Sequence, residues 1–312
     1  MEQGRDIDLL AFGDPVADLM LQAAQLPPPG GKTLGRALGI RAGGTTANVA
    51  CAIARQGMRA AAFGRTGDDA HAPLLRASFA EHGVNQTYLS TLADTPSASA
   101  IAVLAPSGEK SIIYMPMPGR LLESGGLTQA LRRARLVYAM PYDLDEFELL
   151  CGLARQAGAR VAIDLEAAVA PDPLAMRRRA ALADIVFFNE AGFEAGTGVP
   201  PSLPAMRELL ALGPEEVVVS CGAAGAMAVS HGDEMRQPAF PARVVDTTGA
   251  GDCFNAAYLA ARLDGRPLPH ALRCACAAAS LAIGAVGARG ALPDRDQVDA
   301  LLAAGRTPAT DN

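Results

Sequence analysis

The sequence predicts an α/β fold in which helices cover both faces of a mostly parallel sheet. Short apolar runs bounded by turn residues alternate along the chain with longer segments rich in Ala and Leu. The runs are continuous rather than alternating, as in strands that are buried on both faces. Half of the 312 residues are apolar and 19% are charged, so a large core is available and disordered or fibrous classes are excluded.

The predicted strands follow one another along the chain, with helical segments between the later ones. The strands are expected at residues 9–12, 61–63, 136–140, 161–163, 185–188 and 217–219, and helices at 146–157 and 204–212. The length is roughly twice a usual domain of about 150 residues, but large α/β folds often fill it as one unit. We therefore expect a single domain over residues 1–312.

Two stretches, about residues 14–41 and 97–117, interrupt this alternation of strands and helices. The first contains Pro27-Pro28-Pro29-Gly30-Gly31, and the second consists of two extended runs, 98–104 and 110–115, joined by a hairpin-like turn at 106–109. Extended segments inserted between the first elements of the main sheet predict a small β-sheet lid rather than a second domain.

Charge and composition exclude several classes of partner. The net charge is -6, and the longest run of basic residues is 177–179, so no surface for nucleic acid is expected. The weakly charged stretch 275–288 is shorter than the roughly 20 residues of a membrane span. The N-terminus lacks the basic region of a secretory signal, and the six cysteines are scattered, so we expect a cytoplasmic protein with buried thiols.

The most informative segment is Asp246-Thr247-Thr248-Gly249-Ala250-Gly251-Asp252, which precedes an Ala-rich helical run. Backbone amides without bulky side chains at a helix start form a cradle for an anion, and the helix dipole adds positive potential there. Asp252 is either an ordinary carboxylate of the first helical turn or a general base beside a phosphoryl group. Spacing alone leaves both interpretations open.

Residues 246–259 match every position of the C-terminal signature of the PfkB (ribokinase-like) family of carbohydrate kinases, which the chain therefore resembles. Residues 43–50, Gly-Gly-Thr-Thr-Ala-Asn-Val-Ala, resemble its N-terminal signature, except that Thr46 stands where the family usually has Gly, Ala or Pro. Segments 64–69, 107–110 and 220–226 resemble further family segments in family order. The resemblance covers about residues 8–303 and implies a ribokinase-like three-layer α/β/α sandwich with a β-sheet lid.

The resemblance assigns a role to each matching position. It implies that Asp252 is the catalytic base and that the amides of Gly249, Ala250 and Gly251 form the anion hole. The implied acceptor-binding residues are Asp18, Gly43, Gly44 and Asn48. The implied nucleotide-binding residues are Asn189, Ser220, Gly222, Gly225 and Thr248.

Two cation sites are also implied. The Asn-x-x-Glu motif of the family, linked to Mg²⁺ and phosphate, would be residues 189–192, but its Glu is replaced by Gly192. Glu190, Glu194 or water could take that role, and Mg²⁺ is expected to arrive with ATP. Asp246 and Thr248 match a monovalent-cation site, with carbonyls of residues 285–290 as further ligands, and the sequence leaves open a K⁺ ligand or a purely structural Asp246.

The expected function is an ATP-dependent kinase that phosphorylates a hydroxyl of a small sugar, sugar acid or polyol. The alternatives are a nucleoside kinase, including one for pseudouridine, and a catalytically silent protein that binds sugars or nucleotides. Aromatic residues make up only 4% of the chain, which favours a plain sugar over a nucleoside. Lids of the family commonly mediate dimers, and Ala100, Ile101, Ile112 and Ile113 could supply such a surface.

Overall fold

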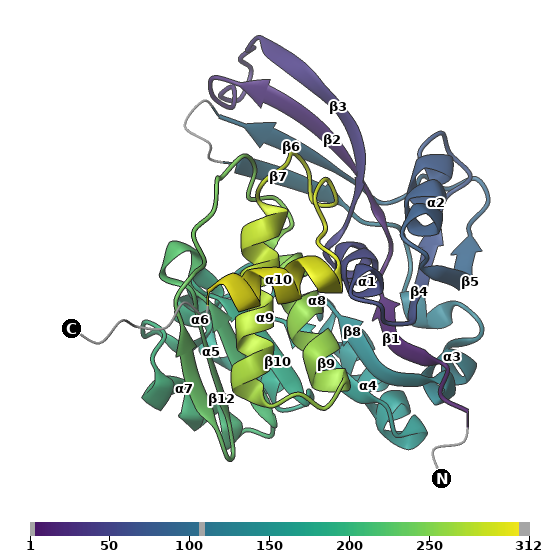
Figure 1. The fold of residues 1–312 in the computed structure, drawn as a ribbon. Coiled ribbons are helices and arrows are strands. Elements are labelled where there is room, and N and C mark those ends of the chain that lie inside the picture. Colours follow the sequence, from purple (N-terminus) through teal and green to yellow (C-terminus); the bar gives the residue numbers. More distant parts are fainter. Residues whose placement is uncertain (1–3, 106–109, 306–312) are drawn as a thin grey trace.

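The computed structural model describes residues 4–105 and 110–305. The predicted turn at 106–109 lies outside these residues. Within them, a nine-stranded main sheet has the order β13-β12-β11-β10-β9-β8-β1-β4-β5 (Figure 1). Its strands are β1 (Ile7–Phe12), β4 (Ala60–Thr66), β5 (Asn85–Thr91), β8 (Ala134–Ala139), β9 (Arg160–Asp164), β10 (Ile185–Asn189), β11 (Glu216–Ser220), β12 (Ala226–Ser230) and β13 (Glu234–Gln237).

Neighbouring strands from β5 to β11 are parallel, and only β12 and β13 are added in antiparallel fashion at one edge. The continuous apolar runs are explained by burial on both faces. In β1, Leu9 and Ala11 pack into one hydrophobic core, and Leu10 and Phe12 pack into the other. The predicted mostly parallel sheet is therefore confirmed.

Helices form a layer on each face of the main sheet. The first core contains α1 (Thr45–Arg55), α2 (Ala72–Glu81), α8 (Ala250–Leu263), α9 (Leu268–Ala282) and α10 (Arg295–Ala304). The second contains α3 (Leu127–Arg133), α4 (Leu144–Ala157), α5 (Pro173–Ala180), α6 (Glu190–Thr197) and α7 (Leu203–Leu210). The local sequence sets their limits: α4 begins where Asp143 accepts a hydrogen bond from the Glu146 amide and ends at the left-handed Gly158.

A four-stranded lid stands off the body, at the top of Figure 1. Its strands are β2 (Val16–Ala23), β3 (Gly35–Gly43), β6 (Ser99–Leu104) and β7 (Lys110–Met115), in the order β3-β2-β6-β7. The two outer pairs are antiparallel, and the central pair of β2 and β6 is parallel. The predicted small sheet is thus present, and both interrupting stretches of the sequence contribute to it.

A buried ion pair joins the lid to the body where the chain enters and leaves the lid. Arg65 at the end of β4 is paired with Asp14, which precedes β2, and their side chains are 7% and 9% exposed. Arg65 Nη1 also donates to the carbonyl of Pro118, which follows β7, at 2.9 Å. One guanidinium group therefore holds both ends of the lid.

No helix in residues 4–105 and 110–305 is both long and apolar enough to cross a membrane.

Candidate active site

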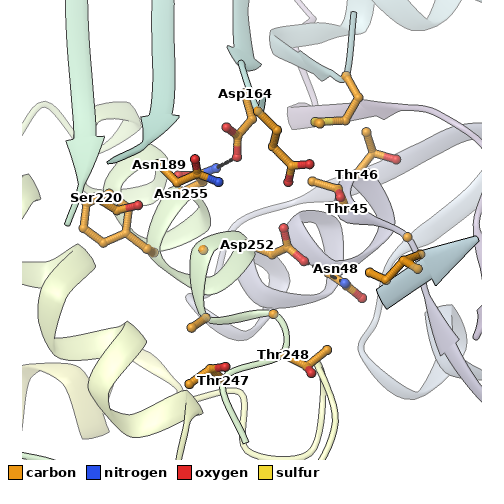
Figure 2. Close-up of a pocket in the computed structure, with 18 of the residues that line it drawn as sticks. Thr45, Thr46, Asn48, Asp164, Asn189, Ser220, Thr247, Thr248, Asp252 and Asn255 are labelled. Atoms are coloured by element: carbon orange, nitrogen blue, oxygen red, sulfur yellow. Dashed lines mark hydrogen bonds between the residues drawn. The ribbon is translucent and has the colours of Figure 1, made fainter. Parts of the chain in front are cut away.

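A cleft of about 1690 Å³ lies between the lid and the carboxyl ends of the central strands. Strands β2, β6 and β7 of the lid line one side, and the ends of β9, β10 and β11 and the start of α8 line the other. This is where ligands are expected in parallel α/β sheets. Figure 2 shows Asp252 near the middle, between Asn48 on one side and Asn189 and Ser220 on the other.

The predicted glycine-rich turn lies at the start of α8. Gly249 has a φ of 78°, in the left-handed region, and a Cβ atom there would lie 2.6 Å from Cβ of Ala288, so position 249 requires glycine for two reasons. The Ala250 amide donates to the Thr247 carbonyl at 3.2 Å, which closes the turn. The amides of Gly251 and Asp252 belong to the first helical turn, where the positive end of the helix dipole favours an anion.

Asp252 is half-buried, and its carboxylate accepts a hydrogen bond from a residue of helix α1. Asn48 in the first turn of α1 donates from Nδ2 to Oδ2 of Asp252 at 2.7 Å. The Oδ1 atom of Asn48 accepts a hydrogen bond from Nε of Arg289 at 2.9 Å. Because a guanidinium group can only donate, this contact fixes which end of the Asn48 amide faces Asp252.

Arg289 was not predicted as a site residue. Besides Asn48, its guanidinium group donates to the hydroxyl of Ser78 at 2.7 Å and to the carbonyl of Gly43 at 3.0 Å, and it lies 5.6 Å from the ring centre of Phe79. Burial lowers the pKa of this guanidinium group. Arg289 thus links the loop after α9 to α1, α2 and the end of β3 behind the cleft.

The residues predicted to bind the acceptor lie where the lid meets the start of α1. Asp18 on β2 lines it, and a side chain at Gly43 would overlap the carboxylate of Asp18, which explains glycine at position 43. Gly44 has a φ of 92° and caps α1. Thr46, where the chain departs from the family signature, is buried and fits because Gly13 opposite has no side chain.

Two of the residues predicted to bind the nucleotide, Asn189 and Ser220, lie at the ends of β10 and β11. Asn189 caps α6 by accepting the Gly192 amide at 2.7 Å, and the Ser220 hydroxyl donates to the Phe188 carbonyl at 3.4 Å. Gly225 has a φ of 95° and no room for a side chain beside the Gln237 carbonyl. The cleft thus brings together all the predicted catalytic, acceptor-binding and nucleotide-binding residues except Gly43, which lies beside the Asp18 carboxylate.

Asp246 lies outside the lining of the cleft. Its Oδ1 accepts the Thr248 amide at 2.9 Å and its Oδ2 accepts the Gly287 amide at 2.8 Å. The carboxylate therefore ties the turn before α8 to the 285–290 loop.

A second group that the sequence did not reveal lies one helical turn beyond Asp252. Asn255 donates to Oδ2 of Asp164 at 2.8 Å and to the hydroxyl of Tyr138 at 3.0 Å. Burial, with smaller contributions from the negative charges of Glu166 and Asp252, raises the pKa of Asp164 to about 7. The only local signal for this group was the position of Asp164 at the carboxyl end of a predicted strand.

Comparison with known proteins identifies the chain's relatives. Residues 6–295 match the profile of the pfkB family of carbohydrate kinases. The chain belongs to this family. The predicted fold and enzyme class are thereby confirmed: the protein is a phosphotransferase that transfers a phosphoryl group from ATP to a hydroxyl of a sugar or nucleoside.

The relatives of this pfkB kinase match over most of their length. A ribokinase of Arabidopsis thaliana is 30% identical over an alignment of 309 residues. The alignment covers 94% of this chain and 80% of the relative. An aminoimidazole riboside kinase of Salmonella typhimurium is 31% identical over an alignment of 293 residues. The alignment covers 83% of this chain and 87% of the relative. The solved structure of Arabidopsis thaliana ribokinase complexed with ribose and ATP has a TM-score of 0.81 at 28% identity. The match covers 95% of this chain and 98% of the ribokinase chain.

Proposed function

We propose that Asp252 is the general base of this kinase and takes the proton of the acceptor hydroxyl. The acceptor oxygen forms a bond to the γ-phosphorus, the bond between that phosphorus and the bridging oxygen of ADP breaks, and the proton passes to Oδ of Asp252. The observation that carries the proposal is the position of Asp252 at the start of α8, between the residues predicted to bind the acceptor and those predicted to bind the nucleotide. Phosphoryl transfer depends mainly on positioning and electrostatics. The amides of Gly249 and Gly251 are proposed to stabilise the charge on the transferred group, while the Ala250 amide already donates to the Thr247 carbonyl.

Asp252→Asn tests this role. The substitution keeps the size of the side chain, so the fold and ATP binding should persist while kcat falls by roughly 10² to 10⁴, the range for a positioned general base. Circular dichroism and ATP binding measured by calorimetry provide the control for folding. A variant that retains more than half of the wild-type kcat would show that Asp252 is not the base.

Asp18 is proposed to bind hydroxyls of the acceptor. It lies on a lid strand and lines the cleft, and Gly43 leaves room for its carboxylate. A carboxylate that loses its hydroxyl partners costs on the order of 1 to 3 kcal/mol, so Asp18→Ala should raise KM for the acceptor about tenfold or more. KM for ATP should change little, and equal losses for both substrates would show that Asp18 supports the fold instead.

ATP is proposed to lie against Asn189, Ser220, Gly222, Gly225 and Thr248, with Mg²⁺ bound through its phosphates. A solved relative at 28% identity is a complex with ribose and ATP, which supports the nucleotide assignment. Mg²⁺ commonly uses one or two carboxylates together with substrate phosphates, and Glu190, which lines the cleft, is one candidate. When it is bound, the cation neutralises the negative charge of the phosphates.

A nucleoside is the second candidate for the acceptor, because two stacked aromatic side chains line the cleft beside the lid. Tyr114 of the lid stacks on Tyr142 of the body with ring centres 6.3 Å apart, and both line the cleft. Such a wall suits a planar base, and one relative is an aminoimidazole riboside kinase. ATP turnover on matched sugars and nucleosides tests this, and Tyr142→Ala should raise KM for a nucleoside more than for its free sugar.

The K⁺ site implied by the resemblance is proposed to act through Asp246. This carboxylate joins the turn before α8 to the 285–290 loop, so a cation held by that loop would order the anion hole. Turnover in KCl and in NaCl at equal ionic strength tests the proposal. Equal rates would leave Asp246 with its structural role alone.

A homodimer through the lid is proposed from the exposed edge strand β7. Ile112 and Ile113 on this edge are 58% and 56% exposed. An unpaired edge with apolar side chains favours association. Ile113→Lys should shift a dimer to monomer in sedimentation velocity, and a wild-type protein that is monomeric at all concentrations would contradict the proposal.

A cytoplasmic location is also proposed. All six cysteines are free thiols, and burial raises the pKa of Cys151 and Cys253 to about 12. Unreactive free thiols fit a reducing compartment, and cell fractionation tests this.

A further inference from the structure

We infer that Glu166 and Asp164 bind the divalent cation that accompanies the nucleotide, in place of the glutamate that position 192 lacks. This inference rests on the proposed kinase function and assigns a part of the same cleft. Two observations support it: position 192 has no room for a side chain, and one buried oxygen atom of Asp164 has no hydrogen-bond partner among the described residues.

Position 192 has no room for a side chain. A Cβ atom on Gly192 would overlap the carbonyl oxygen of Leu165 and would lie 3.1 Å from Cα of Glu166. These are main-chain atoms, so the clash could not be relieved by rotating a side chain. The reason is that the chain leaving β9 passes directly over the start of α6.

The segment that closes position 192 is held firmly. The Leu165 amide donates to the Phe187 carbonyl at 2.9 Å, which extends the pairing between β9 and β10 by one residue. The carbonyl of Glu166 accepts hydrogen bonds from the amides of Val169 and Ala170 at 2.9 and 3.0 Å. The same segment therefore excludes a glutamate at 192 and fixes the backbone of another glutamate, Glu166, next to that position.

Asp164 contributes an oxygen atom whose environment lacks a donor. The residue is 9% exposed, and its Oδ2 accepts a hydrogen bond from the side-chain amide of Asn255 at 2.8 Å. Its Oδ1 is buried and has no hydrogen-bond partner among the residues that the structure describes. A buried carboxylate oxygen in that position costs free energy unless a cation, a water or a donor meets it.

The charges around this position also favour a cation. Asp164 and Glu166 line the same cleft as Asp252 and the 249–251 turn. Three carboxylates that line one cleft repel one another. A divalent cation would relieve this repulsion.

The pair fits a cation that arrives with the nucleotide better than a permanently bound one. No group of three His, Cys, Asp or Glu side chains in the described part of the chain could hold a metal ion alone. Mg²⁺ needs six oxygen ligands and usually takes one or two carboxylates, with phosphate oxygens and water for the rest. Two carboxylates in the lining of the cleft are a sufficient protein contribution.

Glu190 is the competing ligand. It is exposed, begins α6 and lines the cleft. Its position in the first turn of a helix also has a simpler explanation, since a negative charge there stabilises the helix dipole. Binding measurements can separate the two assignments.

The experiment measures Mn²⁺ binding to the full-length protein in the presence of ADP by electron paramagnetic resonance, with calorimetry of ADP binding in EDTA alongside. Glu166→Gln should weaken Mn²⁺ binding to the enzyme–ADP complex by roughly 10- to 100-fold. ADP binding without a cation should stay the same or become tighter. Asp164→Asn should also weaken Mn²⁺ binding. Glu208 is an exposed glutamate on α7, and Glu208→Gln is the matched control.

The outcomes separate this inference from the proposed function. If wild type phosphorylates a sugar or nucleoside but Glu166→Gln binds Mn²⁺ normally, the assignment to Glu166 is wrong. If Glu190→Gln alone weakens Mn²⁺ binding, Glu190 is the ligand. If wild type binds Mn²⁺ and ADP but phosphorylates no sugar or nucleoside, the proposed function fails and the binding result still stands. Circular dichroism of each variant identifies any that fail to fold.

Discussion

Asn48 contacts the proposed base and is itself oriented by Arg289. The chain of contacts runs from Ser78 and Gly43 through the guanidinium group of Arg289 to Asn48 Oδ1, and from Asn48 Nδ2 to Asp252. Arg289 does not line the cleft, so it is a positioning residue. Its effect on the reaction should pass through Asn48.

We therefore expect Arg289→Met to lower kcat about tenfold, because losing a buried donor costs on the order of 1 to 3 kcal/mol. A double-mutant cycle with Asn48→Ala is the decisive measurement. In the Asn48→Ala background, Arg289→Met should have little further effect on kcat. Additive effects of the two substitutions would show that Arg289 does not work through Asn48. Arg132→Met, at an exposed position on α3, is the control.

Sequence reasoning found the residues whose signal is local and missed those whose role depends on contacts between distant segments. The 249–252 turn was recognisable because glycines, a helix start and Asp252 are adjacent. Arg289 meets Asn48 across 241 positions, and Asn255 meets Asp164 across 91 positions. Neither contact leaves a pattern in the sequence near either partner.

The same distinction holds for strands. Strands β1, β4, β8, β9, β10 and β11 were predicted because burial on both faces demands continuous apolar runs. Strands β5 and β13 were not predicted, since both lie at the edges of the main sheet and carry exposed polar residues. At an edge, pairing with one neighbour decides the strand, and the sequence pattern is weak.

Strand β1 is fixed at its beginning by Asp8, which is 6% exposed. Its carboxylate accepts hydrogen bonds from the amide, Nε and Nη2 of Arg59 at 2.8 to 2.9 Å and from Arg135 at 3.3 Å. The side-chain hydrogen bonds from Arg59 are the largest cause that lowers the pKa of Asp8 to about 2. These contacts tie β1 to the starts of both neighbouring strands.

A carboxyl group with a lowered pKa stabilises the fold above its usual pKa of about 4 and loses that contribution as pH falls towards 2. Asp8→Asn should therefore lower the urea midpoint at pH 7, and the difference from wild type should shrink between pH 4 and pH 2. Asp299→Asn on the exposed face of α10 is the control. A difference that stays constant over this pH range would contradict the assignment.

The attachment of the lid to the body should depend on the pair of Arg65 and Asp14. Arg65→Met leaves the carboxylate of Asp14 buried without its partner, which should lower the free energy of unfolding by about 3 to 5 kcal/mol. Adding Asp14→Asn removes that charge, so the double variant should recover part of the loss. Urea denaturation measures both effects. A double variant less stable than Arg65→Met would contradict an electrostatic origin of the loss.

The connectivity of the lid has a consequence for the order in which the protein is made. Strands β2 and β3 are synthesised before β6 and β7, and α1, β4, α2 and β5 lie between them in the chain. Closing so long a loop carries an entropic cost, so we expect the parallel pairing of β2 with β6 to follow the folding of the intervening segments. A nascent chain that ends before residue 99 therefore carries a hairpin with an open inner edge, and we expect it to be the stage at which the protein most needs a chaperone.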